Sequence, residues 1–262
     1  MHTEINNPKI DHTVRTFVRR SRRMTQLQCS SYQNLYTSWC INYSLLKSTF
    51  STCDNAKNNK IKNADENLSN IINKDGTFDF FSLFGNNATI TCEIGFGQGD
   101  ATALIAKNNP CKNYLCIEVF QAGIASLLAK IESEKLTNIR IIEGDAIDIL
   151  ETITPNESIS AFHFFFPDPW QKKKHHKRRF LRRPRTDLLR NKLIAQGYIY
   201  MVTDWQDYAF DAFTEMSATD GLTSLYEGFA PHQEWRAQTK FELRAIKEGR
   251  QIYEMMFEKQ AT

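Results

Sequence analysis

The sequence predicts a doubly wound α/β fold, in which helices cover both faces of a mostly parallel sheet. Strand-like and helix-like segments alternate five times between residues 88 and 218. A glycine-rich turn separates the first strand from its helix, and an acidic residue lies near the end of each strand. Ligands of such sheets bind outside the carboxyl ends of the strands, so these acids mark the predicted site.

The first unit places a glycine-rich turn between a strand at residues 88–94 and a helix at residues 100–107, with glycines at Gly95, Gly97 and Gly99. Such a turn lets a ligand approach the backbone closely and presents free helix N–H groups. The spacing is E-x-G-x-G-x-G, which differs from the G-x-G-x-x-G of dinucleotide binders and disfavours a nicotinamide dehydrogenase. The acid of this motif, Glu93, suits a ligand that carries an ammonium group better than one that carries a pyrophosphate.

The second and third units add two more acids. Glu118 lies near the end of a strand at residues 114–119, where a carboxylate can accept hydrogen bonds from both ribose hydroxyls of an adenosine. Asp145 follows the third strand, where it could meet an adenine amino group, although it is equally a plausible helix N-cap. Taken together with Glu93, these positions indicate a cofactor that contains adenosine.

The fourth strand leads into the most informative stretch of the chain. Residues 162–166 are apolar and aromatic, which is typical of a strand buried on both faces. The strand ends at Pro167-Asp168-Pro169, where the prolines stiffen the loop and remove backbone donors. Residues 172–185 follow with nine Lys and Arg and no acid. A fixed carboxylate beside a polyanion-binding surface indicates chemistry performed on nucleic acid.

The rest of the chain completes the sheet and adds an N-terminal extension. We expect a helix at residues 186–195, a strand at residues 198–204 that ends in Asp204, a helix to residue 218, and two late strands. Residues 1–79 are predicted to form a basic arm and a poorly ordered extension of helices and loops, and residues 80–262 the main domain.

The formal net charge of +3 conceals an uneven distribution. Residues 15–23 and 172–185 contain no acid and hold 14 of the 33 Lys and Arg, which leaves 19 cations against 30 acids elsewhere. This pattern predicts a cationic face on an acidic body, although a charge run can also be merely solvated surface.

The six cysteines show neither C-x-x-C pairs nor metal-ligand spacing, and we expect no metal site. The N-terminus lacks the apolar core of a signal peptide, and no run of about 18 apolar residues occurs, so we expect a cytoplasmic protein without a membrane span.

Six motifs resemble the bacterial tRNA (guanine-N7-)-methyltransferases: EIGFGQG, IEV, GDA, FFFPDPWQKKKHHKRR, TDWQDYA and RAQTKFELR. The resemblance covers about residues 80–258 and the segment VRTFVRRSRRMT, with departures at Gln171 and Ala245. It implies a Rossmann-like, S-adenosylmethionine-dependent fold with seven strands, the last of them antiparallel.

The resemblance also implies roles for individual residues. Contacts to S-adenosylmethionine fall on Glu93, the glycine turn, Glu118, Asp145 and Asp168, and Asp168 is the expected catalytic residue. The expected substrate contacts are Lys172, Asp204, Thr239, Lys240, Phe241 and Glu242. The expected RNA-binding residues are Lys174, His175, His176, Lys177, Arg178 and Arg179.

The implied reaction produces 7-methylguanosine in tRNA, at position 46 of the variable loop. Guanine N7 has a lone pair and no proton, so Asp168 is expected to orient the reactants and not to accept a proton. Asp168 and Asp204 could accept hydrogen bonds from guanine N1–H and the amino group. The alternatives are a methyltransferase acting on another RNA or on a small molecule, or a non-catalytic RNA-binding protein. We expect tRNA as partner, no obligatory protein partner, and a monomer or homodimer.

Overall fold

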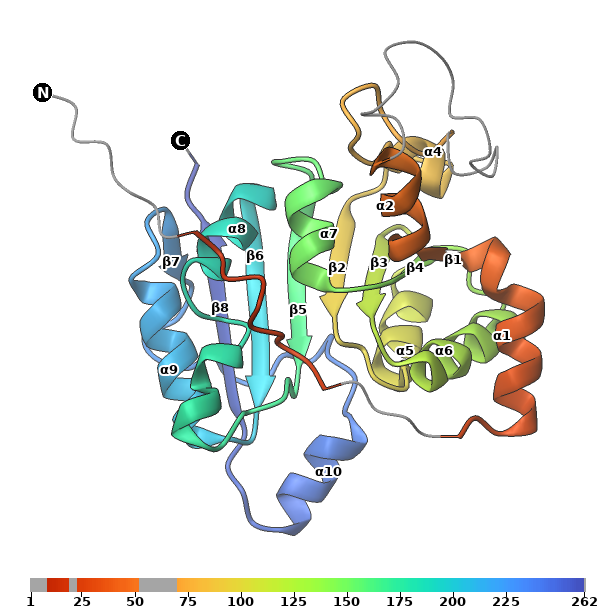
Figure 1. The fold of residues 1–262 in the computed structure, drawn as a ribbon. Coiled ribbons are helices and arrows are strands. Elements are labelled where there is room, and N and C mark those ends of the chain that lie inside the picture. Colours follow the sequence, from red (N-terminus) through yellow and green to blue (C-terminus); the bar gives the residue numbers. More distant parts are fainter. Residues whose placement is uncertain (1–8, 19–22, 52–69, 262) are drawn as a thin grey trace, which may run out of the picture.

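The computed structural model describes residues 9–18, 23–51 and 70–261 (Figure 1). Its strands form a single eight-stranded sheet in the order β1-β4-β3-β2-β5-β6-β8-β7. The strands are β1 (Cys40–Asn42), β2 (Ile90–Ile94), β3 (Asn113–Glu118), β4 (Ile139–Glu143), β5 (Ile159–Phe165), β6 (Leu193–Thr203), β7 (Leu222–Ser224) and β8 (Tyr253–Lys259).

The sheet confirms the predicted mostly parallel, doubly wound fold. Strands β1 to β6 run parallel to one another, and β8 is antiparallel to both β6 and β7. The sheet has eight strands where we predicted seven, because β1 pairs with β4 at one edge. This strand comes from the extension predicted at residues 1–79. Both predicted parts of the chain therefore contribute strands to the same sheet.

Helices cover both faces of the sheet, as predicted (Figure 1). One face packs against α1 (Gln26–Trp39), α5 (Asp100–Asn108) and α6 (Gln121–Glu134). The other packs against α2 (Tyr43–Ser51), α4 (Phe80–Phe84), α7 (Ala146–Thr152), α8 (Arg185–Lys192) and α9 (Gln206–Ser217). No helix in the described ranges has the length and apolar character needed to cross a bilayer.

Side-chain alternation along the strands explains the two cores. Leu115 and Ile117 of β3 enter one core, whereas Tyr114 and Cys116 enter the other. Successive side chains of a strand point to opposite faces, and a parallel sheet covered on both sides needs apolar residues at both positions. The strand sequence therefore reads as a continuous apolar run.

The sixth strand begins earlier than expected. We predicted a helix through residue 195, but α8 ends at Lys192 and β6 starts at Leu193. The pairing of β6 with β5 shifts register between Ile159 and Ala161, and Gln196 adopts a positive φ of 62°. The irregular segment explains why these residues lack a clear strand pattern in sequence.

The carboxyl ends of the parallel strands meet at one edge of the sheet (Figure 1). Two further segments reach this edge. One is the N-terminal segment of residues 9–18, which we call the strap. The other is α10 (Lys240–Lys247), which lies at the bottom of the view in Figure 1.

Helix α6 lies directly against the glycine turn. A Cβ atom added at Gly123 would lie only 2.0 Å from the carbonyl oxygen of Gly97. This approach fixes the turn between β2 and α5, and only a residue without a side chain permits it.

We predict that Gly123→Ala lowers the free energy of unfolding by about 1–3 kcal/mol, because the new methyl group forces the turn and the helix apart. In a helix without this contact, the same change would raise stability by about 1 kcal/mol. Urea unfolding should show the loss, while Ser133→Ala on the exposed face of α6 should leave stability nearly unchanged. Increased stability of Gly123→Ala would contradict the observed packing.

Candidate active site

A cavity at the carboxyl edge brings together segments that are far apart in the sequence. The glycine turn and the ends of β3 and β4 form one part, and the loop after β5 and the start of α10 form another. The acids and glycines that line it are Glu93, Gly95, Gly97, Gly99, Asp100, Glu118, Gly144 and Asp168. Most of the predicted cofactor contacts therefore share one cavity.

The glycine turn lies between a strand and a helix, as the sequence predicted, and its glycines have left-handed backbone conformations. Gly95, Gly97 and Gly99 have φ values of 76°, 60° and 70°, which L-residues with side chains rarely adopt. The Gly97 N–H donates to the Glu118 carboxylate at 2.9 Å. The other oxygen of Glu118 accepts from the N–H groups of Val119 and Phe120 at 2.7 and 3.1 Å. Backbone donors thus hold this acid at the edge of the cavity.

Glu93 is buried beneath the turn, with 3% of its surface exposed. Burial, together with a smaller contribution from the nearby charge of Glu118, raises the pKa of its carboxyl group to about 8. A cation bound beside Glu93 would relieve both effects. The site is therefore suited to the ammonium group of an amino acid.

Asp145 lies next to the cavity but does not line it. Its carboxylate caps α7 by accepting from the Ile147 N–H at 3.0 Å, and its flanking residues Gly144 and Ala146 line the cavity. The side chain lines an adjoining groove that shares Phe120 with the cavity. Burial raises the pKa of Asp145. Its predicted contact with the cofactor remains a prediction.

The loop after β5 brings Asp168 into the cavity. Phe166 and Trp170, on either side of it, have positive φ values of 51° and 48°, a conformation rarely adopted by bulky residues. Arg179 holds this loop, because its Nε–H donates to the Pro169 carbonyl oxygen at 3.0 Å.

Arg179 departs from its predicted place on the RNA-binding surface. Its side chain is fully buried and forms ion pairs with Asp207 and, at 3.1 Å, with Asp211 of α9. Its guanidinium group thus binds groups of the protein itself. The basic run therefore contains an arginine with a structural role, and the surrounding cations in the sequence give no sign that it is buried.

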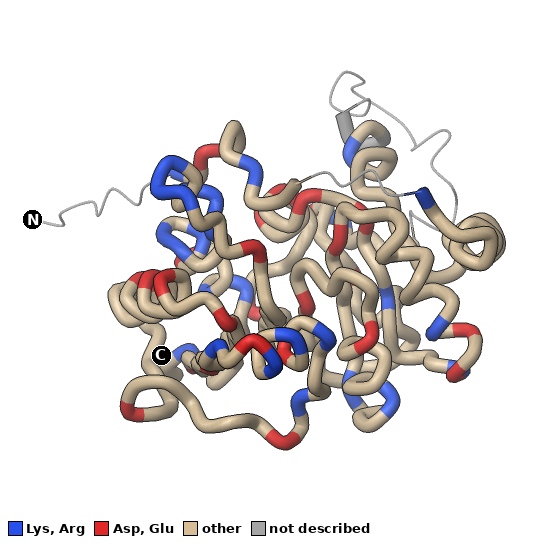
Figure 2. The backbone as a smooth tube through the Cα atoms, turned by 90° about the horizontal axis from the view of Figure 1, so that it is seen from below, with Lys and Arg blue, Asp and Glu red and all other residues tan. Residues whose placement is uncertain are grey.

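Arg185, the first residue of α8, is also buried, and Arg182 and Arg183 form ion pairs with Glu215 of α9. The other cations of the run lie on and beside a 3₁₀ helix, η1 (Lys173–Arg178), and contribute to the charge distribution in Figure 2. The lysines are exposed: Lys172, Lys173, Lys174 and Lys177. The histidines are half-buried, and His176 lies 3.2 Å from Arg179 Nη2. The lysines are thus the members of the run best placed to contact phosphates.

Arg178 holds the strap over the cavity. Its guanidinium group donates to the carbonyl oxygens of Arg15 and Phe17 at 2.7 and 2.6 Å and lies 3.6 Å from the ring centre of Trp170. Trp170 Nε1–H also donates to the Thr16 carbonyl oxygen at 3.2 Å. Residues 16–18 consequently line the cavity, a contact that sequence reasoning missed. The sequence identified a basic arm there but carried no signal for where it packs, and residues 19–22 lie outside the described residues.

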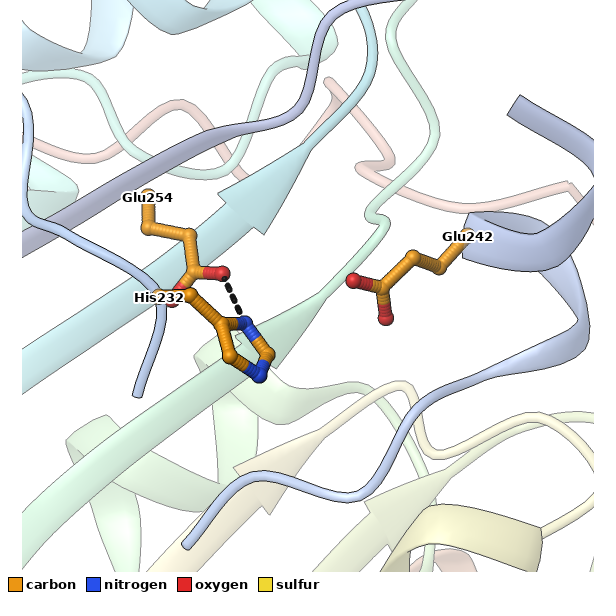
Figure 3. Close-up of side chains that lie close together, drawn as sticks. All are labelled: His232, Glu242 and Glu254. Atoms are coloured by element: carbon orange, nitrogen blue, oxygen red, sulfur yellow. Dashed lines mark hydrogen bonds and ion pairs between the residues drawn. The ribbon is translucent and has the colours of Figure 1, made fainter. Parts of the chain in front are cut away.

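The predicted substrate segment at the start of α10 divides into two groups. Thr239, Lys240 and Phe241 line the cavity, whereas Glu242 is buried behind it. Figure 3 shows the carboxylates of Glu242 and Glu254 and the imidazole of His232 turned toward one another.

This cluster has the composition of a metal site, but a guanidinium group supplies its positive charge. Arg236 donates to both oxygens of Glu242 at 2.5 and 2.6 Å and to Glu254 at 2.8 Å. The result is an ionic connection from the start of α10 to β8. The predicted contact between Glu242 and tRNA is untested, and its carboxylate is already engaged by Arg236.

Asp204 lies outside the cavity lining found among the described residues. It is half-buried at the end of β6 and forms an ion pair with Arg250. Its predicted role in reading guanine therefore remains a prediction, and the structure adds a structural role for it.

Sequence comparison agrees with this geometry. A family model described as a putative methyltransferase matches residues 87–255. A tRNA (guanine-N(7)-)-methyltransferase of Treponema pallidum (strain Nichols) is 44% identical over 246 residues, which cover 93% of this chain and 95% of the relative. The corresponding protein of Bordetella pertussis is 33% identical and covers 97% of this chain and 88% of its own length. The chain belongs to the tRNA (guanine-N(7)-)-methyltransferase family.

The fold of this family member also occurs in a more distant methyltransferase. The crystal structure of the 16S rRNA methyltransferase KamB superposes with a TM-score of 0.52 at 13% identity, over 70% of this chain and 93% of KamB. This likeness concerns the fold alone, a Rossmann-like α/β sheet.

We predict that this tRNA (guanine-N(7)-)-methyltransferase binds S-adenosylmethionine more tightly as the pH rises from about 5.5 to 7.5, by up to about tenfold per pH unit. Protonated Glu93, with a pKa of about 8, cannot attract an ammonium group, whereas the carboxylate can. Calorimetric titration should show the slope, and Glu93→Gln should remove it and weaken binding. A flat profile in the natural protein would contradict this account of Glu93.

Glu93 should have the opposite effect on the pH dependence of the free energy of unfolding. Because the pKa of Glu93 is higher in the folded protein than the ordinary glutamate value of 4.5, the folded state binds the extra proton. Without ligand, the stability supplied by Glu93 should therefore fall as the pH rises from about 4.5 to 8, and Glu93→Gln should show less decline.

We also predict that Arg179 and its lysine neighbours respond differently to substitution. Arg179→Gln should lower stability by about 3 kcal/mol, because it removes a buried cation from Asp207 and Asp211. Lys174→Gln should leave stability unchanged and reduce the salt dependence of tRNA binding by about one phosphate contact. Chemical denaturation and binding titrations at several salt concentrations separate the two effects. A stable Arg179→Gln protein with a reduced salt slope would restore the predicted RNA-binding role.

Proposed function

We propose that this protein transfers the methyl group of S-adenosylmethionine to N7 of a guanine in tRNA, giving 7-methylguanosine, with position 46 of the variable loop as the target. The observation that best supports this proposal is that the glycine turn, Glu93 and Asp168 line one cavity. Membership of the family supports the reaction, and the motifs of the sequence support the position.

The residues of the cavity fit the three parts of S-adenosylmethionine. Buried Glu93 offers a partner for the ammonium group, and the positive-φ glycines let the cofactor approach the backbone. Glu118, held by backbone N–H groups, offers oxygens for the ribose hydroxyls. When bound, S-adenosylmethionine supplies a sulfonium methyl group that a nucleophile can attack.

The protein's contribution to the reaction is positioning. Guanine N7 attacks through a lone pair that lies in the plane of the base and carries no proton, so no general base is required. The loop after β5 holds Asp168 where it can orient the guanine edge and stabilise the positive charge that develops on the purine. Arg179 anchors this loop through Pro169 and is a positioning residue.

Exposed lysines beside the cavity support an RNA substrate over a small molecule. Lys172, Lys174 and Lys177 are exposed next to the loop that carries Asp168. RNA binding through phosphates requires such exposed surface cations, and a folded RNA presents its target as an exposed, splayed base. A small substrate would gain little from them.

The test is methyl transfer from labelled S-adenosylmethionine to unmodified tRNA transcripts, followed by nucleoside analysis. We expect label in 7-methylguanosine and a loss of rate of about 100-fold or more in Asp168→Asn. Asp220→Asn, an exposed acid just before β7, should be unaffected and serves as the matched control.

Each other outcome identifies an alternative. Label in a different RNA would show that the substrate is not tRNA, and a transcript with position 46 replaced by adenosine tests the target position. Binding of cofactor and tRNA without transfer would indicate a non-catalytic RNA-binding protein. Full activity of Asp168→Asn would remove Asp168 from the mechanism.

A further inference from the structure

Two phenylalanine rings face one another at the cavity. The ring centres of Phe166 and Phe241 are 6.4 Å apart, and their planes differ by 25°. Phe166 follows the end of β5, and Phe241 lies in the first turn of α10, 75 positions later in the chain. Both rings line the cavity that contains Asp168.

The fold holds the backbone that carries each ring. The Phe166 N–H donates to the Val202 carbonyl oxygen at 2.8 Å, so the sheet holds its left-handed backbone, a kind of strain that concentrates at functional sites. Thr239 caps α10 by accepting from the Glu242 N–H at 3.2 Å, and Arg236 anchors Glu242. Neither ring is placed by chance packing.

The exposure of Phe241 points to a ligand. Its side chain is 48% exposed, although a ring of this size normally gains from burial. It is exposed at the cavity, beside Phe166 and above the same space that Asp168 reaches. A flat, apolar-faced ligand with a polar edge matches this combination of two parallel rings and one acid.

The distance between the two ring centres, which includes any lateral offset, can be compared with the spacing of a stacking slot. A base stacked on both faces requires ring separations of about 7 Å, twice the optimal contact distance of about 3.5 Å. The observed 6.4 Å is also compatible with direct offset contact between the two rings. A base can enter where the two ring planes lie face to face with about 7 Å of perpendicular spacing between them.

We propose that the target guanine enters between Phe166 and Phe241, with its polar edge at Asp168. Enzymes that modify a base take it out of its stack and hold it between aromatic side chains while hydrogen bonds read its edge. The slot is a specificity-determining element: the rings select a flat base, and the acid selects its edge. This inference rests on the proposed function for the identity of the base.

The experiment compares three substitutions of residues on α10. Phe241→Leu keeps an apolar side chain but removes the aromatic face, and should lower kcat/KM for tRNA by about 10- to 100-fold. Phe241→Tyr keeps the face and should stay within about threefold of the natural protein. Leu243→Ala, at a residue that is 55% exposed on the same helix, should have no effect.

Binding of S-adenosylmethionine, measured separately, should be unchanged in all three variants. Natural rates in Phe241→Leu would overturn the proposal, as would an equal loss in Leu243→Ala, which would indicate a docking face on α10 in place of a slot. A parallel loss of cofactor affinity in Phe241→Leu would assign the ring to the cofactor and also overturn it.

A second readout does not depend on methyl transfer. In Phe241→Trp, the fluorescence of the new indole should be quenched by tRNA that contains guanine at the target position, and not by tRNA in which that nucleotide is abasic. Quenching without methyl transfer would retain the slot and reject the proposed reaction. Identical fluorescence with both tRNAs would overturn the slot, whatever the activity.

Discussion

A buried guanidinium group must have its charge compensated within the protein, and this constraint organises the loops around the cavity. Arg179 meets it through the Pro169 carbonyl oxygen and two acids of α9. Arg236 meets it through Glu242 and Glu254. Removing the acids would leave a buried guanidinium charge uncompensated, so each pairing stabilises one arrangement of its loop. Through these two arginines, α9 and β8 determine where the segments that carry Asp168 and Phe241 lie.

The cavity separates negative and positive charge over a short distance. Glu93 and Glu118 lie within it, whereas the exposed lysines of η1 lie beside its opening. Burial keeps the Glu93 carboxyl protonated at neutral pH until a cation arrives, which limits repulsion between the two acids. The same molecule can therefore attract a cationic amino group inside and a polyanion outside.

The strap connects these two regions. Arg178 belongs to the basic segment, yet its guanidinium group binds carbonyl oxygens of residues that line the cavity. The same guanidinium group stacks on Trp170, which belongs to the loop that carries Asp168. The basic segment is thus a part of the cavity wall as well as a charged surface.

The sequence by itself determined the order of strands and helices, the glycine turn and the position of the acids at one edge. These features depend on local periodicity, on the backbone freedom of glycine and on the parallel direction of successive strands. Each of these can be recognised from short segments of the sequence. Only the tertiary structure decided that Arg179 is buried, that Glu242 pairs with Arg236, that β1 joins the sheet, and that Phe166 faces Phe241. Burial and pairing depend on which distant segments pack together, and a charged or aromatic residue has the same local signature whether it faces solvent, an ion partner or a ligand.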